Sequence, residues 1–189
     1  MAVDADLMMI NLSAVQRANY VNGPGRRFVV WVQGCHLGCP ECWNKHTWSF
    51  APKKQMSVGA LFAQISAVEG LDGVTLTGGE PFLQPRPLAH LAQRIKSELN
   101  LSIQIFTGFE MREIKGRAQK KLLSLADVVV AGRYNPNIQN NGQIVYNFGV
   151  IHWAFNNTDV EAEIAPDGSV LLTGYPSDGL IADIKREAG

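Results

Sequence analysis

Strand-like and helix-like patterns alternate along this 189-residue chain as far as residue 133. Runs of apolar and β-branched residues predict strands at 26–32, 73–79, 101–108 and 127–132. Apolar residues at helical spacing predict the intervening helices, at 57–69, 85–100 and 110–126. Strands separated by helices of about a dozen residues are typical of βαβ units, and therefore of a parallel sheet with right-handed crossovers.

The number of predicted strands limits the fold class. About four strands fit before residue 133, which is too few to close an eight-stranded barrel. We therefore expect an α/β fold built as a partial, open parallel β/α barrel. Residues 133–160 are rich in asparagine and have no clean period, so irregular structure with room for one strand is expected there.

The pattern becomes regular again near the end of the chain. Alternation on both sides of Asp167-Gly168 predicts a β-hairpin, because this dipeptide is a strong turn signal. A last helix is predicted from Ser177 to Glu187. We expect one domain over 1–189, in which 133–189 is an atypical C-terminal portion.

Composition and charge exclude several classes of protein. The chain is 46% hydrophobic and 18% charged, as in globular proteins that fold in water. Seventeen basic and seventeen acidic residues cancel, so no net field attracts nucleic acid or a membrane surface. No apolar run reaches the roughly 18 residues of a membrane span, and the N-terminus does not resemble a signal peptide. We expect a cytoplasmic protein with neither nucleic acid nor membrane as a partner, whose cysteines stay reduced.

All three cysteines of the chain lie in one loop after the first predicted strand: Cys35, Cys39 and Cys42. Thiolates this close repel one another unless a cation neutralises them, and sulfur ligands favour zinc or iron–sulfur clusters. A 4Fe-4S cluster usually takes four cysteines. Two interpretations follow. Either a histidine, His46 or His36, completes a zinc site, or one iron of a cluster is left open for a ligand, as catalytic metal sites leave a position open.

A second motif ends the second predicted strand, where the sequence reads TLTGGEP over 75–81. Two glycines allow a ligand to approach the backbone closely. The C-terminal ends of parallel strands are also where open α/β sheets hold ligands. A ligand site is therefore predicted at this strand end, close to the cysteine loop.

The C-x3-C-x2-C loop and the GGEP strand end together resemble the radical S-adenosylmethionine superfamily. The resemblance implies that the three cysteines hold three irons of one 4Fe-4S cluster, and that the fourth iron binds S-adenosylmethionine. It also implies a binding segment for the cofactor's amino group, with Glu80 as the partner of the ammonium. The segment consists of Thr77, Gly78, Gly79 and Glu80.

Two stretches at either end of the cysteine loop indicate which members of this superfamily the chain resembles. VNGPGRRFVVWVQGC at 21–35 and CPECWNKHTW at 39–48 are similar to small glycyl-radical-enzyme activases, in particular the anaerobic ribonucleotide reductase type. The resemblance covers 10–134. It implies an enzyme that cleaves S-adenosylmethionine reductively to a 5′-deoxyadenosyl radical. This radical abstracts hydrogen from a glycine of a larger partner enzyme, and a flavodoxin or ferredoxin donates the electron.

Two other functions stay open at this point. One is a stand-alone radical enzyme that modifies a small molecule or a peptide. The other is a non-catalytic iron–sulfur or zinc protein.

The chain departs from the activase pattern after the fourth strand, where Ala131-Gly132 replaces an Asp-Gly pair. We expect the following Arg133 to supply the cation that holds the cofactor's carboxylate, and Thr107 to lie near its ribose. Of the remaining candidates, His90 is predicted to lie in the middle of a helix as a surface or boundary residue, and Trp31 is predicted as a core residue.

Overall fold

The computed structural model describes residues 4–149, 151, 153–154, 160–164, 170–174 and 178–187. Within these ranges seven strands form one sheet in the order β3-β1-β2-β4-β5-β6-β7. The strands of this sheet are β1 (Met9–Asn19), β2 (Arg27–Val32), β3 (Lys54–Ser57), β4 (Gly73–Gly78), β5 (Ser102–Thr107), β6 (Val128–Ala131) and β7 (Ile144–Asn147). The α-helices are α1 (Val58–Ser66), α2 (Pro85–Arg94), α3 (Arg117–Leu123) and α4 (Asp178–Glu187).

The centre of the sheet is parallel and its edges are antiparallel. Strands β2, β4, β5 and β6 pair in parallel, as their alternation with helices predicts. The prediction of a parallel sheet is wrong at the edges, because β1 runs antiparallel to β2 and β3, and β7 runs antiparallel to β6. Strands β1 and β3 were also missed. The inward positions of β1 mix Ile10 and Leu12 with Gln16 and Asn19, so no apolar run marks the strand.

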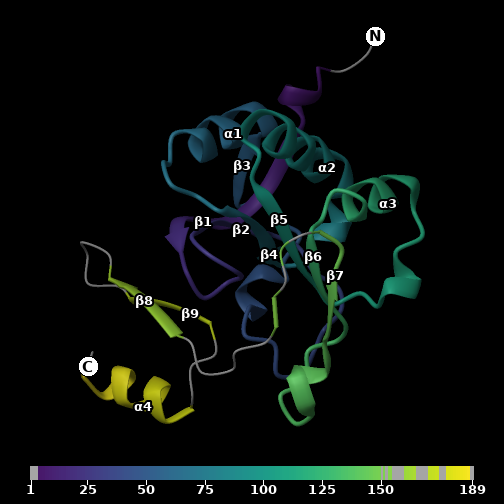
Figure 1. Ribbon diagram of the computed structural model, residues 1–189. Helices are drawn as coiled ribbons and strands as arrows, with labels where there is room; N and C mark the ends of the chain where they lie inside the picture. Colours follow the sequence, from purple (N-terminus) through teal and green to yellow (C-terminus); the bar gives the residue numbers. More distant parts are fainter. Residues whose placement is uncertain are drawn as a thin grey trace.

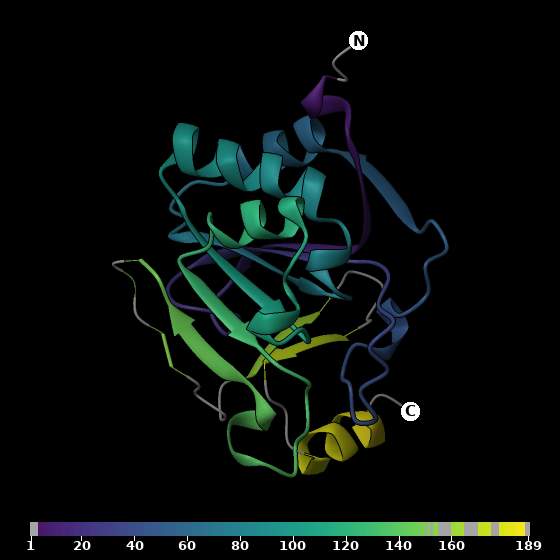
Figure 2. The same cartoon turned by 90° about the vertical axis from the view of Figure 1, so that its right-hand side faces the viewer.

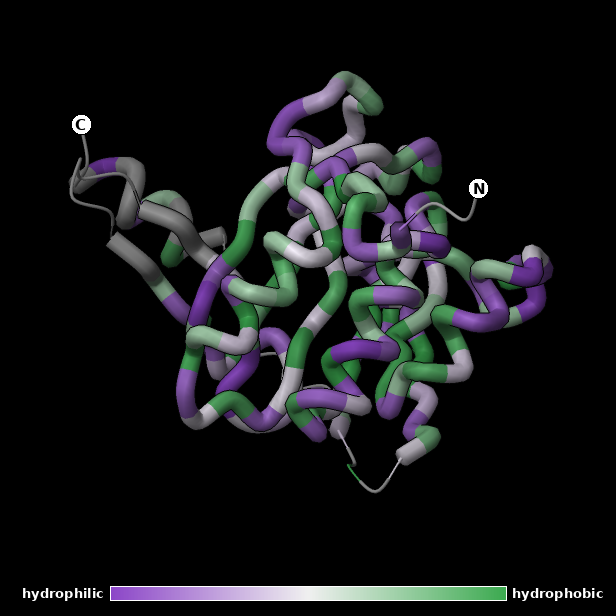
Figure 3. The backbone as a smooth tube through the Cα atoms, turned by 90° about the horizontal axis from the view of Figure 1, so that it is seen from above, coloured by the Kyte–Doolittle hydropathy of each residue, from purple (hydrophilic) through white to green (hydrophobic). Residues whose placement is uncertain are grey.

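Helices α1, α2 and α3 cover one face of the sheet (Figures 1 and 2). The core lies between this face and the helices, with Phe28, Val30, Leu76, Ile105 and Val129 among its buried residues. Seen from above, hydrophobic residues recur along the central part of the chain trace and hydrophilic residues gather on the outer loops (Figure 3). None of the helices within the described ranges is long and apolar enough to cross a bilayer.

All three helices predicted before residue 133 have different boundaries in the structure, and α1 ends at Ser66 instead of residue 69. Ser57 caps α1, since its side chain accepts from the Ala60 amide at 3.2 Å. Helix α2 passes into a π-helical turn, η4 (Ile95–Leu99). Helix α3 starts at Arg117 and not at 110, because the chain before it forms a separate 3-10 turn, η5 (Met111–Glu113). The apolar residues of 110–126 that predicted one helix are therefore divided between η5 and α3.

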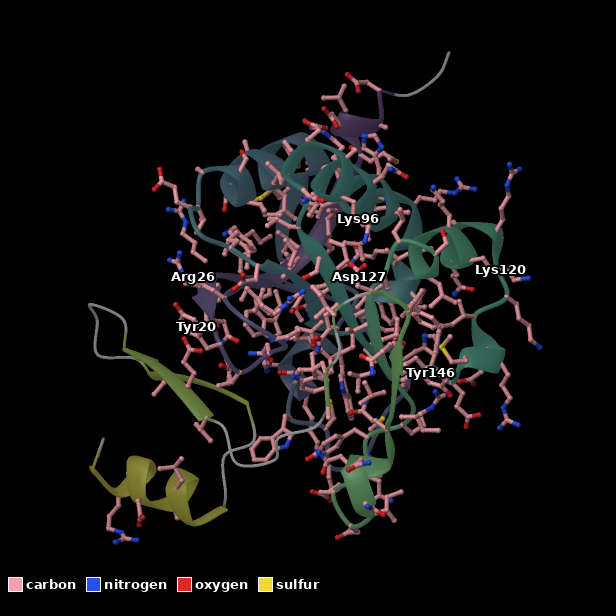
Figure 4. The ribbon with its side chains drawn as sticks, in the orientation of Figure 1. Tyr20, Arg26, Lys96, Lys120, Asp127 and Tyr146 are labelled. Atoms are coloured by element: carbon pink, nitrogen blue, oxygen red, sulfur yellow. The ribbon has the colours of Figure 1, made fainter. Side chains whose placement is uncertain are left out.

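An ion pair fixes the end of α2 to the sheet. The Lys96 ammonium lies 2.7 Å from both carboxylate oxygens of Asp127, just before β6 (Figure 4). The same carboxylate accepts from the Ile103 amide at the start of β5. The Asp127 carboxylate therefore joins η4 to the N-terminal ends of β5 and β6, which lie away from the cysteine loop.

The other face of the sheet carries a cluster of buried polar residues among apolar ones such as Val29. Arg27, Thr75 and Gln104 lie on it with almost no exposed surface. The Arg27 guanidinium donates to Thr75 Oγ1 at 2.7 Å and to Ser102 Oγ at 3.0 Å, while burial lowers its pKa to about 10. These contacts satisfy the buried guanidinium within the protein.

The C-terminal hairpin borders this face. Strands β8 (Val160–Ile164) and β9 (Val170–Gly174) pair antiparallel, which confirms the predicted hairpin, although its Asp167-Gly168 turn lies outside the described residues. Asn19 Nδ2 donates to Thr173 Oγ1 at 3.0 Å, and the Tyr20 amide donates to Glu161 at 2.8 Å. Helix α4 follows, as predicted. The hairpin is thus attached to the end of β1.

Candidate functional site

Backbone hydrogen bonds close the cysteine loop at its base. The Gly34 amide donates to the Thr47 carbonyl at 2.7 Å, and the Cys35 amide donates to the Trp48 carbonyl at 3.1 Å. Inside the loop the Cys42 amide donates to the Cys39 carbonyl at 3.1 Å, so the chain between these cysteines forms a tight turn. The loop is therefore folded back on itself by main-chain contacts.

The three cysteines are free thiols, are half-buried and line one cavity. Within the described ranges, no three His, Cys, Asp or Glu side chains stand close enough together to hold a single metal ion. A cluster of four irons and four sulfides is wider than one ion, so its ligand sulfurs stand farther apart. Three thiols that line one cavity match the sulfur ligands that such a cluster prefers.

The environment of Cys35 disfavours a bare thiolate. Burial raises the pKa of the Cys35 thiol, the backbone contact at Leu37 lowers it, and the nearby Glu80, Cys42 and Cys39 raise it further. The negative charge of a thiolate at this position therefore needs a cationic partner in the cavity.

The GGEP segment is joined to the cysteine loop through the backbone. The Gly79 amide donates to the Val32 carbonyl at 2.8 Å, and the Glu80 amide donates to the Gly34 carbonyl at 2.9 Å. A Cβ atom on Gly79 would lie 2.5 Å from the Gly34 oxygen, and Gly78 has a φ of +97°. Both positions therefore require glycine. Thr77, Gly78 and Gly79 line the same cavity as the cysteines.

The Glu80 carboxylate is fully buried and is held by three protein donors. Its Oε1 accepts from the Phe82 amide at 2.9 Å and from the Thr107 hydroxyl at 2.8 Å, and its Oε2 accepts from the Gly108 amide at 2.9 Å. Burial raises the pKa of Glu80 to about 7, although these hydrogen bonds and Arg133 favour the charged form. The geometry gives Glu80 a positioning role that joins the ends of β4 and β5.

Thr107 and Arg133 are placed differently from each other. Thr107 is buried and lines the cysteine cavity. Arg133 lines a neighbouring cavity that it shares with Cys39. Its guanidinium forms two hydrogen bonds of 2.9 Å with the Glu113 carboxylate and also donates to the Gly108 carbonyl. Arg133 is thus next to the site but paired with a protein carboxylate.

Several lining residues were not predicted from the sequence. These residues come from separate parts of the chain. Phe106 lies on β5, and Tyr134 and Gln143 lie between β6 and β7. Asn22 comes from the turn before β2 and Gly174 from the end of β9. Only contacts between distant parts of the chain bring them together, so no local pattern could identify them.

The aromatic residue after the third cysteine also has a partner that the sequence does not reveal. Trp43 Nε1 donates to Tyr134 Oη at 2.6 Å, which connects the cysteine loop to the segment after β6. The two other residue predictions are confirmed: Trp31 is buried, and His90 is a half-buried helix residue 3.1 Å from Asp6. His152 lies outside the described residues.

Comparison with known proteins agrees with this site. The model of a family described as "4Fe-4S single cluster domain" matches residues 21–147. The anaerobic ribonucleoside-triphosphate reductase-activating protein of Enterobacteria phage T4 is 30% identical over 68% of this chain and 84% of its own. The protein of the same name from Pasteurella multocida is 32% identical over 68% of this chain and 91% of its own.

Among solved structures, QueE from Escherichia coli is matched at 21% identity with a TM-score of 0.44, over 67% of this chain and 73% of that chain. This likeness is too distant to carry a conclusion. The match over 21–147 includes all three cysteines and the GGEP segment, and it confirms the resemblance that these motifs predict. The chain belongs to the family described as "4Fe-4S single cluster domain" and is related to these activating proteins.

Proposed function

We propose that this protein is a radical S-adenosylmethionine activase that generates a glycyl radical on a separate, larger enzyme of the anaerobic ribonucleotide reductase type. The observation that supports this most is the backbone pairing of Gly79 and Glu80 with Val32 and Gly34, which places the cysteine loop and the GGEP segment around one cavity. The names of the most similar relatives support the same partner.

The proposed site uses the thiolates of Cys35, Cys39 and Cys42 as cluster ligands. The 4Fe-4S cluster and S-adenosylmethionine, when bound, supply one-electron cleavage of a carbon–sulfur bond and abstraction of a hydrogen atom. The protein's part is placement and exclusion of water. Gly78 and Gly79 allow the backbone to approach the cofactor, and the buried Glu80 and Thr107 fix that backbone from behind.

Two finer assignments belong to this proposal. Thr107 is proposed to lie near the cofactor's ribose because it ends β5 at the cavity wall. Arg133 is proposed to attract the cofactor's carboxylate, although its present partner is Glu113. In this proposal the Arg133 guanidinium exchanges the Glu113 carboxylate for the carboxylate of the cofactor. Either carboxylate can pair with a guanidinium through two hydrogen bonds.

The open architecture suits a protein substrate. We propose that the sheet is a partial barrel, within one domain over 1–189, and that a loop of the partner reaches the cavity lined by the three cysteines. A flavodoxin or ferredoxin is proposed as the electron donor, in the cytoplasm, with no role for nucleic acid or membrane. The altered residues after Ala131 then contact the partner or border its loop.

The test is electron paramagnetic resonance on anaerobically reconstituted, dithionite-reduced protein. A reduced 4Fe-4S signal that changes shape on addition of S-adenosylmethionine, followed by a glycyl radical signal when an anaerobic ribonucleotide reductase is added, is the expected result. Cys39→Ala should abolish both signals. Zinc in place of iron would overturn the proposal, and cofactor turnover driven by a small molecule without any protein partner would indicate a stand-alone enzyme.

A further inference from the structure

A cluster of basic side chains lies on the loop and helix that follow β5. Residues 110–121 contain five basic and two acidic residues, in a chain whose charges are balanced overall. All five basic residues are exposed. We call them the basic surface: Arg112, Lys115, Arg117, Lys120 and Lys121.

The two acidic residues in this stretch do not neutralise the basic surface. Glu110 pairs with Arg112 at 2.6 Å, and Glu113 pairs with Arg133 from outside the stretch. Within the described part of the chain, the other four cations of the basic surface form no ion pair with a carboxylate. A local excess of positive charge therefore faces solvent around α3, where Lys120 lies at the outer rim of the molecule (Figure 4).

The segment that leads from β5 into the basic surface lies against the cysteine loop. The ring centroids of Phe109 and His36 are 6.0 Å apart, and a Cβ on Gly108 would lie 2.4 Å from the Leu37 side chain, so β5 leads into η5 directly against the loop. The Arg133–Glu113 pair then connects η5 to the wall of the neighbouring cavity. Cys39 is part of that wall.

This neighbouring cavity opens on the outside of the cysteine loop. Its volume is about 420 Å³, and the exposed residues Gly38, Pro40 and Glu41 of the loop tip line it together with Cys39. Glu41 and Arg133 are its charged residues. Cys39 and Tyr134 line both this cavity and the one that contains the GGEP segment. A protein docked on the outer side therefore reaches a cluster ligand without entering the cavity proposed for the cofactor.

The charge of the chain is distributed unevenly between its two sides. Residues 159–189 contain seven acidic and two basic residues. The β8–β9 hairpin and α3 lie on opposite sides of the sheet in both ribbon views (Figures 1 and 2). An acidic partner is thus attracted to the α3 side.

We propose that the basic surface is the docking face for an acidic, one-electron carrier protein, which delivers its electron to the cluster from the outer side of Cys39. This inference rests on the proposed function. One electron leaves the reduced carrier and one electron enters the cluster, so the carrier is oxidised and the cluster reduced by the same amount. The occupant is a carrier protein because the adjoining cavity contains a cluster ligand, which a nucleic acid or a lipid headgroup has no reason to approach.

The test uses the triple variant Lys115→Gln/Lys120→Gln/Lys121→Gln of the reconstituted protein, with an acidic flavodoxin as the probe. The control triple variant is Arg17→Gln/Lys53→Gln/Lys54→Gln, which removes the same charge from exposed residues of β1, β3 and the segment before β3. These strands form the sheet edge away from β5 and β6. Calorimetry gives the dissociation constant of oxidised flavodoxin, and stopped-flow absorbance gives the rate at which reduced flavodoxin is oxidised.

The basic-surface variant should weaken flavodoxin binding about tenfold at low salt, with a matching loss of electron-transfer rate. The difference should disappear near 0.5 M salt, where the Debye length is roughly 4 Å. The control variant should bind within about twofold of the parent protein. Reduction by dithionite, which needs no docking face, should be equal in all three proteins.

Three results would overturn the docking assignment. The first is equal flavodoxin binding by the two triple variants. The second is binding by the parent protein that does not respond to salt. The third is loss of affinity for a duplex DNA or for the reductase partner while flavodoxin binding is unchanged. Failure of the parent protein to form a cluster reducible by dithionite is a different outcome, since it would remove the proposed function itself.

Discussion

The hydroxyl of Thr107 donates a 2.8 Å hydrogen bond to the buried carboxylate of Glu80, across 27 positions of sequence. The same hydroxyl oxygen accepts from the Phe109 amide at 3.0 Å. This one side chain therefore joins the end of β5 to the GGEP segment and orders the turn that follows. The contact is buried, so its loss leaves polar groups without water as a substitute partner.

Thr107→Val should reduce the free energy of unfolding by about 1–3 kcal/mol, because it removes a donor from Glu80 and an acceptor from Phe109 while keeping the side-chain shape. Thr107→Ser keeps the hydroxyl and should cost less. Urea denaturation of the cluster-free protein measures both. A larger loss in Thr107→Ser than in Thr107→Val would show that packing of the methyl group, and not the hydrogen bond, matters most at this position.

The raised pKa of Glu80 predicts a pH-dependent stability. Burial places the pKa at about 7 in the folded protein, above the ordinary value of 4.5. Between these values the folded state binds more protons than the unfolded state, so the stability contributed by Glu80 is full below pH 4.5 and is lost as pH rises through 7. The loss is on the order of 3 kcal/mol. In Glu80→Gln the side chain at this position cannot titrate, so the pH-dependent part of the stability that Glu80 contributes should be absent.

The measurement is urea denaturation of the parent protein and Glu80→Gln at several values between pH 5 and pH 8. The difference in unfolding free energy between the two proteins should shrink as pH rises and become constant above about pH 8. A difference that is independent of pH would contradict the assignment of the titration to Glu80.

Gly79→Ala should separate the GGEP segment from the cysteine loop. The new Cβ would lie 2.5 Å from the Gly34 carbonyl oxygen, and backbone at both positions has to move. We expect a loss of about 2 kcal/mol or more in stability, together with weaker binding of S-adenosylmethionine. Gly59→Ala in α1 is the control, since its nearest neighbour is a side-chain atom of Asp6 at 3.3 Å and alanine favours a helix. Thermal unfolding and equilibrium dialysis of the cofactor distinguish the two variants.

Arg133 and Glu113 provide opposite tests of the proposed carboxylate contact. If the guanidinium binds the cofactor, Arg133→Ala should raise the dissociation constant of S-adenosylmethionine about tenfold. Glu113→Ala should lower it or leave it unchanged, because it removes the carboxylate that now pairs with Arg133. Equilibrium dialysis on reconstituted protein measures both constants. An equal loss of affinity in both variants would indicate that the ion pair only shapes the loop.

Local signals were sufficient for the central elements of the fold. The β-branched runs of β2, β4, β5 and β6 and the Ser57 cap can all be read within a few residues. The antiparallel edges could not be predicted in this way, because β1 carries polar residues such as Gln16 and Asn19 at buried positions. Their burial depends on contacts with distant residues, such as that of Asn19 with Thr173.

The candidate site likewise contains residues that a local pattern reveals and contacts that it does not reveal. The spacing of the three cysteines and the two glycines of GGEP identified the residues around the cavity without any structure. The contacts of Glu80 with a ligand ammonium and of Arg133 with a ligand carboxylate remain predictions. The structure gives both side chains protein partners, Thr107 and Glu113, which are 27 and 20 positions away. Pairings at that separation leave no trace in a local pattern.

The two hydrogen bonds that close the cysteine loop, from Gly34 to Thr47 and from Cys35 to Trp48, involve main-chain atoms alone. No thiol takes part in them, so the base of the loop forms whether or not iron has arrived. Folding can therefore precede metallation, in contrast to small zinc domains that are unfolded without their ion. A cell that makes this protein under iron starvation would accumulate a folded, dormant form, and supplying iron and sulfide later would activate that stock without new synthesis.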